Sequence, residues 1–217
     1  MWRMAVWLTG IVSLVVAFVA ASLAYWNNRR ISAYQGQLER VNKQLEELYG
    51  PLLALSSSNT AAWREFVRRF RPGKAHVFDG SEVSDQDRKT WILWMNSVFL
   101  PSNRRSAELI TTKAHLMVDD AVPQCLLDFC AHVAGYEVTA KRWEQGDYTV
   151  LSSVINHPGS EYNRHIQQRF LELKQLQQRL LAATASSVRQ RSRISIGPAS
   201  AGESAARATA KAGAVAR

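Results

Sequence analysis

Residues Ala5–Trp26 read AVWLTGIVSLVVAFVAASLAYW and contain no acidic, basic or histidine residue. As an α-helix of about 22 residues rising about 1.5 Å each, this run is about 33 Å long, enough to cross a hydrocarbon core of about 30 Å. A cleaved signal peptide and a buried core helix are the alternatives, but the apolar region of a signal peptide is usually only about 7–15 residues long. The run predicts a transmembrane anchor at residues 5–26, after a short flank at 1–4.

Both ends of this run carry side chains that favour the membrane interface. Amphipathic aromatic rings prefer the headgroup region, and a pair of cations after an apolar run is typical of a stop-transfer flank. We therefore expect the interface residues to be Trp2, Trp7, Tyr25, Trp26, Arg29 and Arg30.

The cations on either side of the run predict its orientation. Only Arg3 precedes it, whereas Arg29, Arg30, Arg40 and Lys43 follow within about 20 residues. In a bacterial inner membrane this asymmetry predicts a cytoplasmic C-terminal domain. The chain's two cysteines agree with a reducing compartment and exclude a disulfide framework.

Residues 27–49 have the pattern of an amphipathic helix. Apolar side chains recur at alternating spacings of three and four at Ile31, Tyr34, Leu38, Val41, Leu45 and Leu48. The seam is short, and the flanking positions hold only Gln and Asn, so no charge pattern selects an identical partner. We favour packing within the chain, with a parallel homodimeric coiled coil as the alternative.

A second long amphipathic helix is predicted at residues 161–183. It follows the helix-start signal Asn156–Ser160, and its apolar stripe comprises Tyr162, Ile166, Phe170, Leu173, Leu176 and Leu180. Since both amphipathic helices are of similar length, we expect them to pair as an antiparallel stalk.

Between them, residues 50–160 predict a head of short helices, which makes the fold class all-α. We expect Gly50-Pro51 to kink or interrupt the first helix and Arg71-Pro72-Gly73 to end the next one. Ser84, three residues before Asp87, predicts the N-cap of a helix with Trp91 and Trp94 on its buried face. We expect a break at Pro101–Asn103 before the following helix.

The second half of the head predicts one further helix and an ambiguous segment. Asp119 or Asp120 is expected to cap a helix that has Pro123 in its first turn and ends at Gly135. Its expected inward residues are Leu126, Leu127, Cys130 and Val133. A short helix at residues 137–145 follows, and residues 147–155 have strand composition without a partner strand.

Several of these segments resemble a known group of proteins. Gln44–Leu55 contains the run LYGPL directly after a single span, with further similarity at Trp91–Met95, Val98–Asn103, Leu109-Ile110 and Lys113–Leu116. Over residues 5–180 the chain resembles bacterial single-pass membrane proteins of unknown function. The resemblance implies an anchor with a helical head and no catalytic positions.

The sequence carries no phosphate-binding, dinucleotide-binding, zinc-protease or serine-hydrolase motif. We therefore predict no catalytic residue, no cofactor and no metal site. Two i,i+4 pairs, His115–Asp119 and Asp128–His132, would make a metal site only if their helices met. Cys125 and Cys130 lie on different helix faces and are interpreted as small core residues.

Two residue groups in the head invite a functional interpretation. Trp63, Trp91, Trp94 and Trp143 suggest a ligand pocket or base stacking, but their helical spacing beside phenylalanines favours a core. The basic group Arg64, Arg68, Arg69, Arg71 and Lys74 is typical of a solvated helix end with a Glu65–Arg69 pair. A contact with lipid phosphates, a partner or nucleic acid is the alternative.

Residues 184–217 change to Ala, Ser, Gly and Arg without aromatic side chains, which predicts a disordered basic tail. They hold six basic residues and one acidic residue, so five of the nine net positive charges of the chain lie here. We expect Arg189, Arg191 and Arg193 to contact an anionic membrane surface, with a merely solubilising tail as the alternative. This charge distribution argues against nucleic acid as a partner.

Together these features predict a single-pass membrane protein whose helical head is an interaction or scaffolding module rather than an enzyme. The expected partners are the lipid bilayer, anionic lipid and either another protein or a second copy of the chain. The alternative is a membrane-tethered enzyme or ligand sensor with a site in the head.

Overall fold

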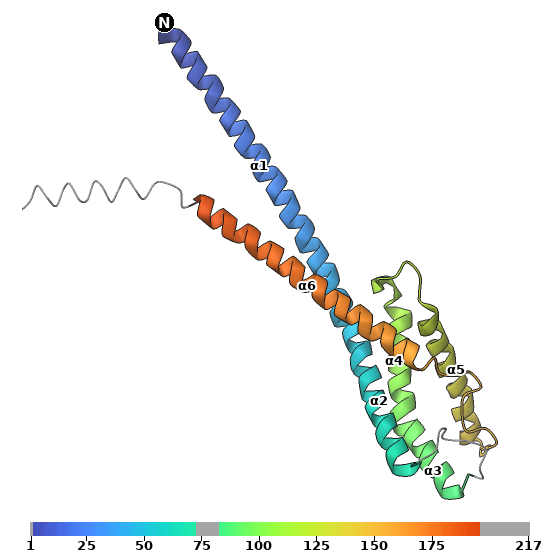
Figure 1. Cartoon of the computed structure of the whole chain (residues 1–217). Coiled ribbons are helices and arrows are strands. Elements are labelled where there is room, and N and C mark those ends of the chain that lie inside the picture. Colours follow the sequence, from blue (N-terminus) through green and yellow to red (C-terminus); the bar gives the residue numbers. More distant parts are fainter. Residues whose placement is uncertain (1, 73–82, 196–217) are drawn as a thin grey trace, which may run out of the picture. The chain divides into compact units, whose positions relative to one another are not determined.

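The computed structural model describes residues 2–72 and 83–195, and every regular element in that part of the chain is a helix (Figure 1). The predicted all-α class is thus confirmed. The chain divides into two compact units. We call residues 40–176 the head unit, and residues 1–39 with 177–217 the terminal unit.

The terminal unit contains the apolar run in one uninterrupted helix. Helix α1 (Trp2–Gln44) passes through residues 5–26 and continues beyond Arg30 into the head unit. Its described apolar side chains are solvent-exposed in the isolated chain, for example Trp7 at 74% and Phe18 at 74%. Among the described residues, one helix is long and apolar enough to cross a membrane.

Two prolines lie inside continuous helices instead of breaking them. A π-helical turn, η1 (Leu45–Tyr49), precedes α2 (Gly50–Phe70), and a second, η2 (Met95–Phe99), precedes α4 (Leu100–Thr112). In each wide turn a backbone N–H donates five residues back, from Gly50 to Leu45 and from Leu100 to Met95. The ring of a proline blocks the normal bond at its position, and the wide turn absorbs this loss. The break expected at Pro101–Asn103 was therefore wrong.

Helix α3 (Asp85–Trp94) begins as predicted. The hydroxyl of Ser84 accepts a hydrogen bond of 3.1 Å from the backbone N–H of Asp87, which confirms the N-cap.

Helix α5 (Gln124–Glu144) differs from the prediction at both ends. Pro123 directly precedes it and neither Asp119 nor Asp120 caps it, while Gly135 lies in its interior. Gly135 does not adopt the positive φ of a glycine that ends a helix, and its missing Cβ leaves room for Ser153, which packs there. The segment predicted as a separate helix at 137–145 is the continuation of α5. Leu127, expected to face inward, is 45% exposed.

Helix α6 (Ser160–Ser195) extends twelve residues past the predicted end at 183. Residues 184–195, predicted as part of the disordered tail, are helical, since extending a helix already started upstream costs less than starting a new one. Residues 196–217 lie outside the described part of the chain.

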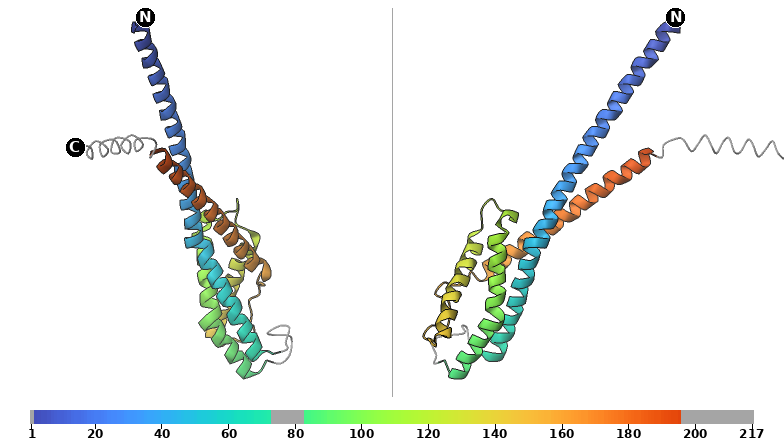
Figure 2. Two further views of the ribbon diagram at one scale, coloured as in Figure 1. Left: turned by 60° about the vertical axis from the view of Figure 1, so that its left-hand side comes forward. Right: turned by 180° about the vertical axis from the view of Figure 1, so that it is seen from behind.

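The core of the head unit is an aromatic cluster between helices that Figure 2 shows side by side. Helix α4 packs against both α2 and α5. The cluster comprises Phe66, Trp91, Met95, Phe99, Leu100, Tyr136, Ala140 and Trp143. The core interpretation thus holds for Trp91 and Trp143, while Trp94 is half-buried and Trp63 is 41% exposed.

Candidate ligand-binding cavity

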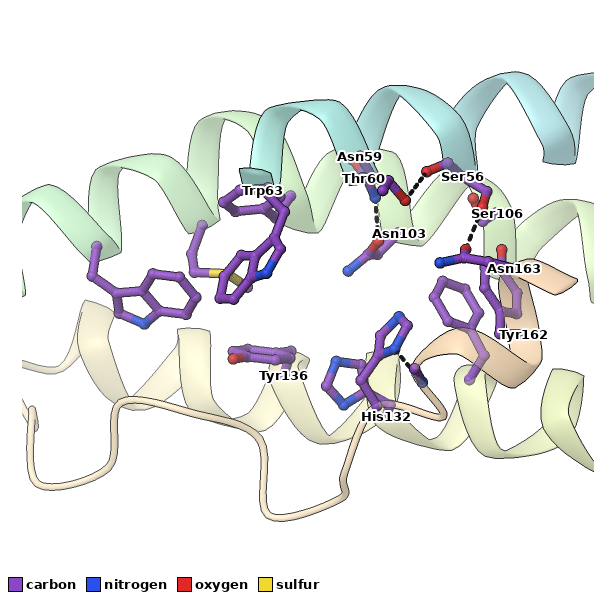
Figure 3. Close-up of a pocket in the computed structure, with 16 residues that line it drawn as sticks. Ser56, Asn59, Thr60, Trp63, Asn103, Ser106, His132, Tyr136, Tyr162 and Asn163 are labelled. Atoms are coloured by element: carbon purple, nitrogen blue, oxygen red, sulfur yellow. Dashed lines mark hydrogen bonds between the residues drawn. The ribbon is translucent and has the colours of Figure 1, made fainter. Parts of the chain in front are cut away.

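A cavity of about 400 Å³ lies within the head unit, between α2, the α3–α4 helix, α5 and the first turn of α6 (Figure 3). This volume is in the range of small-molecule sites. Its aromatic lining is Trp63, Trp91, Phe99, Phe129, Tyr136 and Tyr162. Its polar lining is Ser56, Asn59, Thr60, Asn103, Ser106, His132, His157 and Asn163. Among the described residues, no Asp, Glu, Lys or Arg lines it.

The aromatic walls are held in place by ring contacts. At one end Trp63 stacks on Phe66 with ring centroids 6.0 Å apart, and its edge meets Trp91 at 6.1 Å. At the other end Phe129 of α5 stacks on Tyr162 of α6 at 4.1 Å. Such pairs add stability beyond the apolar area that they bury, so the walls are preorganised.

One wall depends on the segment between α5 and α6, residues 145–159. This segment forms no strand, contrary to its composition, because side chains satisfy its carbonyl groups. The indole Nε1–H of Trp91 donates to the Leu151 carbonyl at 2.7 Å, and that of Trp143 donates to Val150 at 2.8 Å. The Ser153 hydroxyl, packed over Gly135, donates to the carbonyl of His132 at 3.2 Å. The segment is thereby fixed along α5.

The hydrogen bonds of His132 determine its tautomer. Its Nδ1 lies 2.6 Å from the carbonyl oxygen of Ile155, and a carbonyl only accepts, so Nδ1 carries the hydrogen. The ring is buried, which lowers its pKa and keeps it neutral at pH 7. Its Nε2 is therefore a hydrogen-bond acceptor, and it has no protein partner within residues 2–72 and 83–195.

His157 has the opposite tautomer. Its Nδ1 accepts a hydrogen bond of 2.8 Å from the backbone N–H of Gly159, so the neutral ring carries its hydrogen on Nε2. Part of the ring is exposed, but Phe129, His132 and Tyr162 surround the rest. This loss of hydration, followed by repulsion from His132, lowers its pKa to about 4. Both histidines line the cavity, with ring centroids 5.0 Å apart, and their Nε2 atoms are one hydrogen-bond donor and one acceptor.

Asn103 contributes a second donor. The Nδ2 of Asn59 donates to the Oδ1 of Asn103 at 2.6 Å, which orients the Asn103 amide. Figure 3 shows the nitrogen of that amide pointing into the open space. Asn103 is only 8% exposed, and in the described chain its Nδ2 has no hydrogen-bond partner.

The residues considered for a metal site do not come together. Asp119 accepts a hydrogen bond of 2.5 Å from Arg169 and lies 3.6 Å from His165, while Asp128 accepts one of 2.7 Å from Gln124. Within the described residues, no group of three or more His, Cys, Asp or Glu side chains could hold a metal ion.

The two cysteines agree with the core interpretation. Cys125 is buried and Cys130 half-buried, and burial raises the pKa of both thiols. A raised pKa keeps both thiols protonated at neutral pH, and the thiol is a weaker nucleophile than the thiolate.

The basic group at the end of α2 also differs from its prediction. Glu65 pairs with Arg68, three residues on, instead of with Arg69. Arg71 is buried and lies 3.5 Å from Asp87 at the start of α3. Lys74 lies outside the described residues. The group is therefore divided between a solvated helix face and a contact between helices.

The predicted membrane-contact residues lie in the terminal unit. Tyr25 and Trp26 are 60% and 63% exposed, with rings 6.2 Å apart, and Arg29 and Arg30 are exposed on the same helix. The backbone of Trp2 is helical, as is that of Arg189, Arg191 and Arg193, but these four side chains lie outside the described ones.

Sequence reasoning did not identify the polar half of the cavity. Asn59, Asn103 and His157 come from three separate segments, and none is part of a ligand-binding motif. Two signals in the sequence pointed to this cavity: the group of tryptophans, for which a ligand pocket was the less favoured interpretation, and His132, which was considered only as a metal ligand together with Asp128.

Comparisons of the chain with known protein families, with curated proteins and with solved structures find no match. The resemblance to single-pass proteins with an LYGPL segment stays a prediction.

Proposed function

We propose that this protein is a membrane-anchored receptor for a small molecule, which binds in the cavity of its helical head. The observation that carries the proposal is the cavity itself, about 400 Å³ with aromatic walls and convergent polar groups. Concave sites of this composition are typical of small-molecule binding. Of the two functions inferred from the sequence, this supports the ligand sensor.

Anchoring is the second part of the proposal. The apolar run of α1 supports one membrane crossing, and the cations after it support a cytoplasmic head in a bacterial inner membrane. Expressed in bacteria, the chain should stay with the membrane pellet after alkaline carbonate extraction. Release of the intact chain into the supernatant would contradict the anchor.

The basic residues of the tail would provide a further contact with anionic lipid. Each cation near such a surface contributes about 1 kcal/mol, and salt screens the attraction. In a chain lacking residues 1–26, removal of residues 184–217 should weaken binding to anionic vesicles at low salt and have little effect at high salt. Equal binding with and without the tail would contradict this contact.

Ligand binding is tested on the full chain in lipid nanodiscs, by thermal unfolding against a chemically varied set of small molecules. Thr60 lines the cavity on the exposed side of α2, so Thr60→Trp should fill its entrance and abolish the stabilisation by any ligand found. Ser57→Trp, on the same helix and outside the cavity lining, is the matched control. Ligands that stabilise both variants equally, or a set without any stabilising compound, would contradict the proposal.

A second candidate function, an interaction or scaffolding module, is favoured by the outer face of α5. Leu127 and Val138 on that face are 45% and 63% exposed. Exposed apolar side chains along one helix favour a protein partner or a second copy of the chain. Capture from solubilised membranes by the full-length chain, compared with Val138→Lys, tests this candidate. Partners retained equally by both would argue against this face.

A further inference from the structure

The chemistry of the cavity restricts the charge of its ligand. An ionised group that leaves water must be paired, or its desolvation is not compensated. None of the lining side chains within the described chain carries a full charge, and the pKa of His132 and that of His157 are lowered. A carboxylate, phosphate or ammonium group would therefore enter without a counter-ion.

Lining polar atoms that have no hydrogen-bond partner among the described residues restrict the hydrogen-bonding groups of the ligand. The buried hydroxyl of Tyr162 is one of them, but it can donate or accept and so fits either kind of ligand group. Asn103 Nδ2 and His157 Nε2 present N–H donors, and His132 Nε2 presents an acceptor. A ligand that satisfies all three supplies hydrogen-bond acceptors and at least one N–H donor. A carboxamide or a ring amide combines a carbonyl oxygen and an N–H in one neutral group.

The aromatic walls of the cavity restrict the shape of the ligand. Among the lining rings, Trp63 contacts both Trp91 and Phe99, with centroids 6.1 and 5.9 Å apart. Tyr136 and Tyr162 line other parts of the cavity (Figure 3). Rings in such an arrangement favour offset stacking or edge contacts with a flat aromatic partner.

We infer that the cavity takes a neutral, planar aromatic or heteroaromatic ligand that carries an amide group. This inference rests on the ligand-binding function proposed above and names the ligand class for that site. Asn103 and His157 bind the ligand carbonyl oxygen and His132 accepts from its N–H, while the aromatic walls bind the ring.

The test uses three probes of similar size that differ in charge: benzamide, benzoate and benzylammonium. Each is titrated against the full chain in nanodiscs by saturation-transfer NMR, with empty nanodiscs as the blank. Benzamide should bind saturably in the millimolar range, and benzoate and benzylammonium at least about tenfold more weakly. Benzoate or benzylammonium binding as tightly as benzamide would overturn the inference.

Asn103→Asp sharpens this comparison. The new carboxylate still accepts from Asn59, but it removes the donor aimed into the cavity and adds a negative charge. Benzamide binding should weaken by about tenfold and benzylammonium binding should strengthen, whereas the exposed Asn96→Asp should change neither. If the three probes bind Asn103→Asp with the same order and ratio of affinities as the unmodified chain, the inference is overturned. If this variant does not fold, the probe series on the unmodified chain still decides.

Failure of this inference is distinguishable from failure of the proposed function. Charged ligands from the varied set that stabilise the protein and are blocked by Thr60→Trp would refute the ligand class and retain the binding function. The absence of binding by all three probes and by the whole set would refute both.

Discussion

The first prediction concerns Gly135→Ala, a substitution that adds one methyl group where residues 145–159 pack on α5. A Cβ at this position would overlap the Oγ of Ser153, while Ser153 Cβ and Ile155 Cγ1 would lie at the ordinary distances of 3.5 and 3.6 Å. Ser153 Oγ donates to the His132 carbonyl and accepts from the Ile155 N–H, each at 3.2 Å. In Gly135→Ala the hydroxyl must rotate away and both hydrogen bonds are lost.

The expected magnitude follows from three contributions. Two hydrogen bonds of about 1 kcal/mol each are lost, and replacing Gly by Ala inside a helix returns about 1 kcal/mol. Gly135→Ala should therefore lower the free energy of unfolding by about 1 kcal/mol. In a Ser153→Ala background the overlapping hydroxyl is absent, so Gly135→Ala should raise the free energy of unfolding by about 1 kcal/mol. The coupling between the two positions is then about 2 kcal/mol.

The assay is urea unfolding of the full chain in nanodiscs, followed by tryptophan fluorescence. Trp91 and Trp143 donate hydrogen bonds to this segment, so their emission reports its release. Gly36→Ala is the matched control, because Gly36 lies in α1 with no atom within 4 Å of an added Cβ. It should not destabilise the head.

The sign change between the two backgrounds is the decisive result. If Gly135→Ala stabilises the otherwise unmodified chain, or if the coupling lies within about 0.5 kcal/mol of zero, the contact with Ser153 does not hold the segment. The proposed donor and acceptor pair of His132 and His157 would then lack its support.

Two further predictions concern the same segment. The pKa of His157 is lowered from 6.5 to about 4, so between these pH values the unfolded state binds a proton that the folded state does not. The urea midpoint should fall as the pH drops through this window, and it should fall less in His157→Gln; identical profiles would contradict the lowered pKa. Trp143→Phe removes the bond to Val150, of 2.8 Å, and should cost about 1–2 kcal/mol in urea unfolding. Trp26→Phe, at a 63% exposed site, should cost nothing measurable, and equal losses in both variants would refute this role of Trp143.

The sequence predicted those features of the helices that depend on neighbouring residues. The apolar run of residues 5–26 and the Ser84–Asp87 cap depend on composition and near-neighbour hydrogen bonds, so they could be identified without any tertiary information. Prolines and glycines were the main source of error. Pro101 does not break its helix because a π turn absorbs it, and Gly135 does not end α5 because its role is close packing.

The cavity, in contrast, depends on tertiary contacts and could not be predicted from local patterns. Its aromatic wall was partly visible as a group of tryptophans, but spacing alone could not separate a cavity wall from a filled core. Its polar groups come from Asn103 on α4, His132 on α5 and His157 after α5, which no sequence pattern connects. The tautomers of the histidines depend on backbone partners at Ile155 and Gly159, and these are fixed only when the segment docks.

The sequence by itself determined the helical class, the long apolar helix and the uneven distribution of charge, because each depends on composition and short-range periodicity along the chain. Only the tertiary structure decided that the head encloses an uncharged cavity, and which atoms face it. That outcome depends on contacts between residues far apart in the chain, whose side chains become donors or acceptors only through the partners that folding gives them.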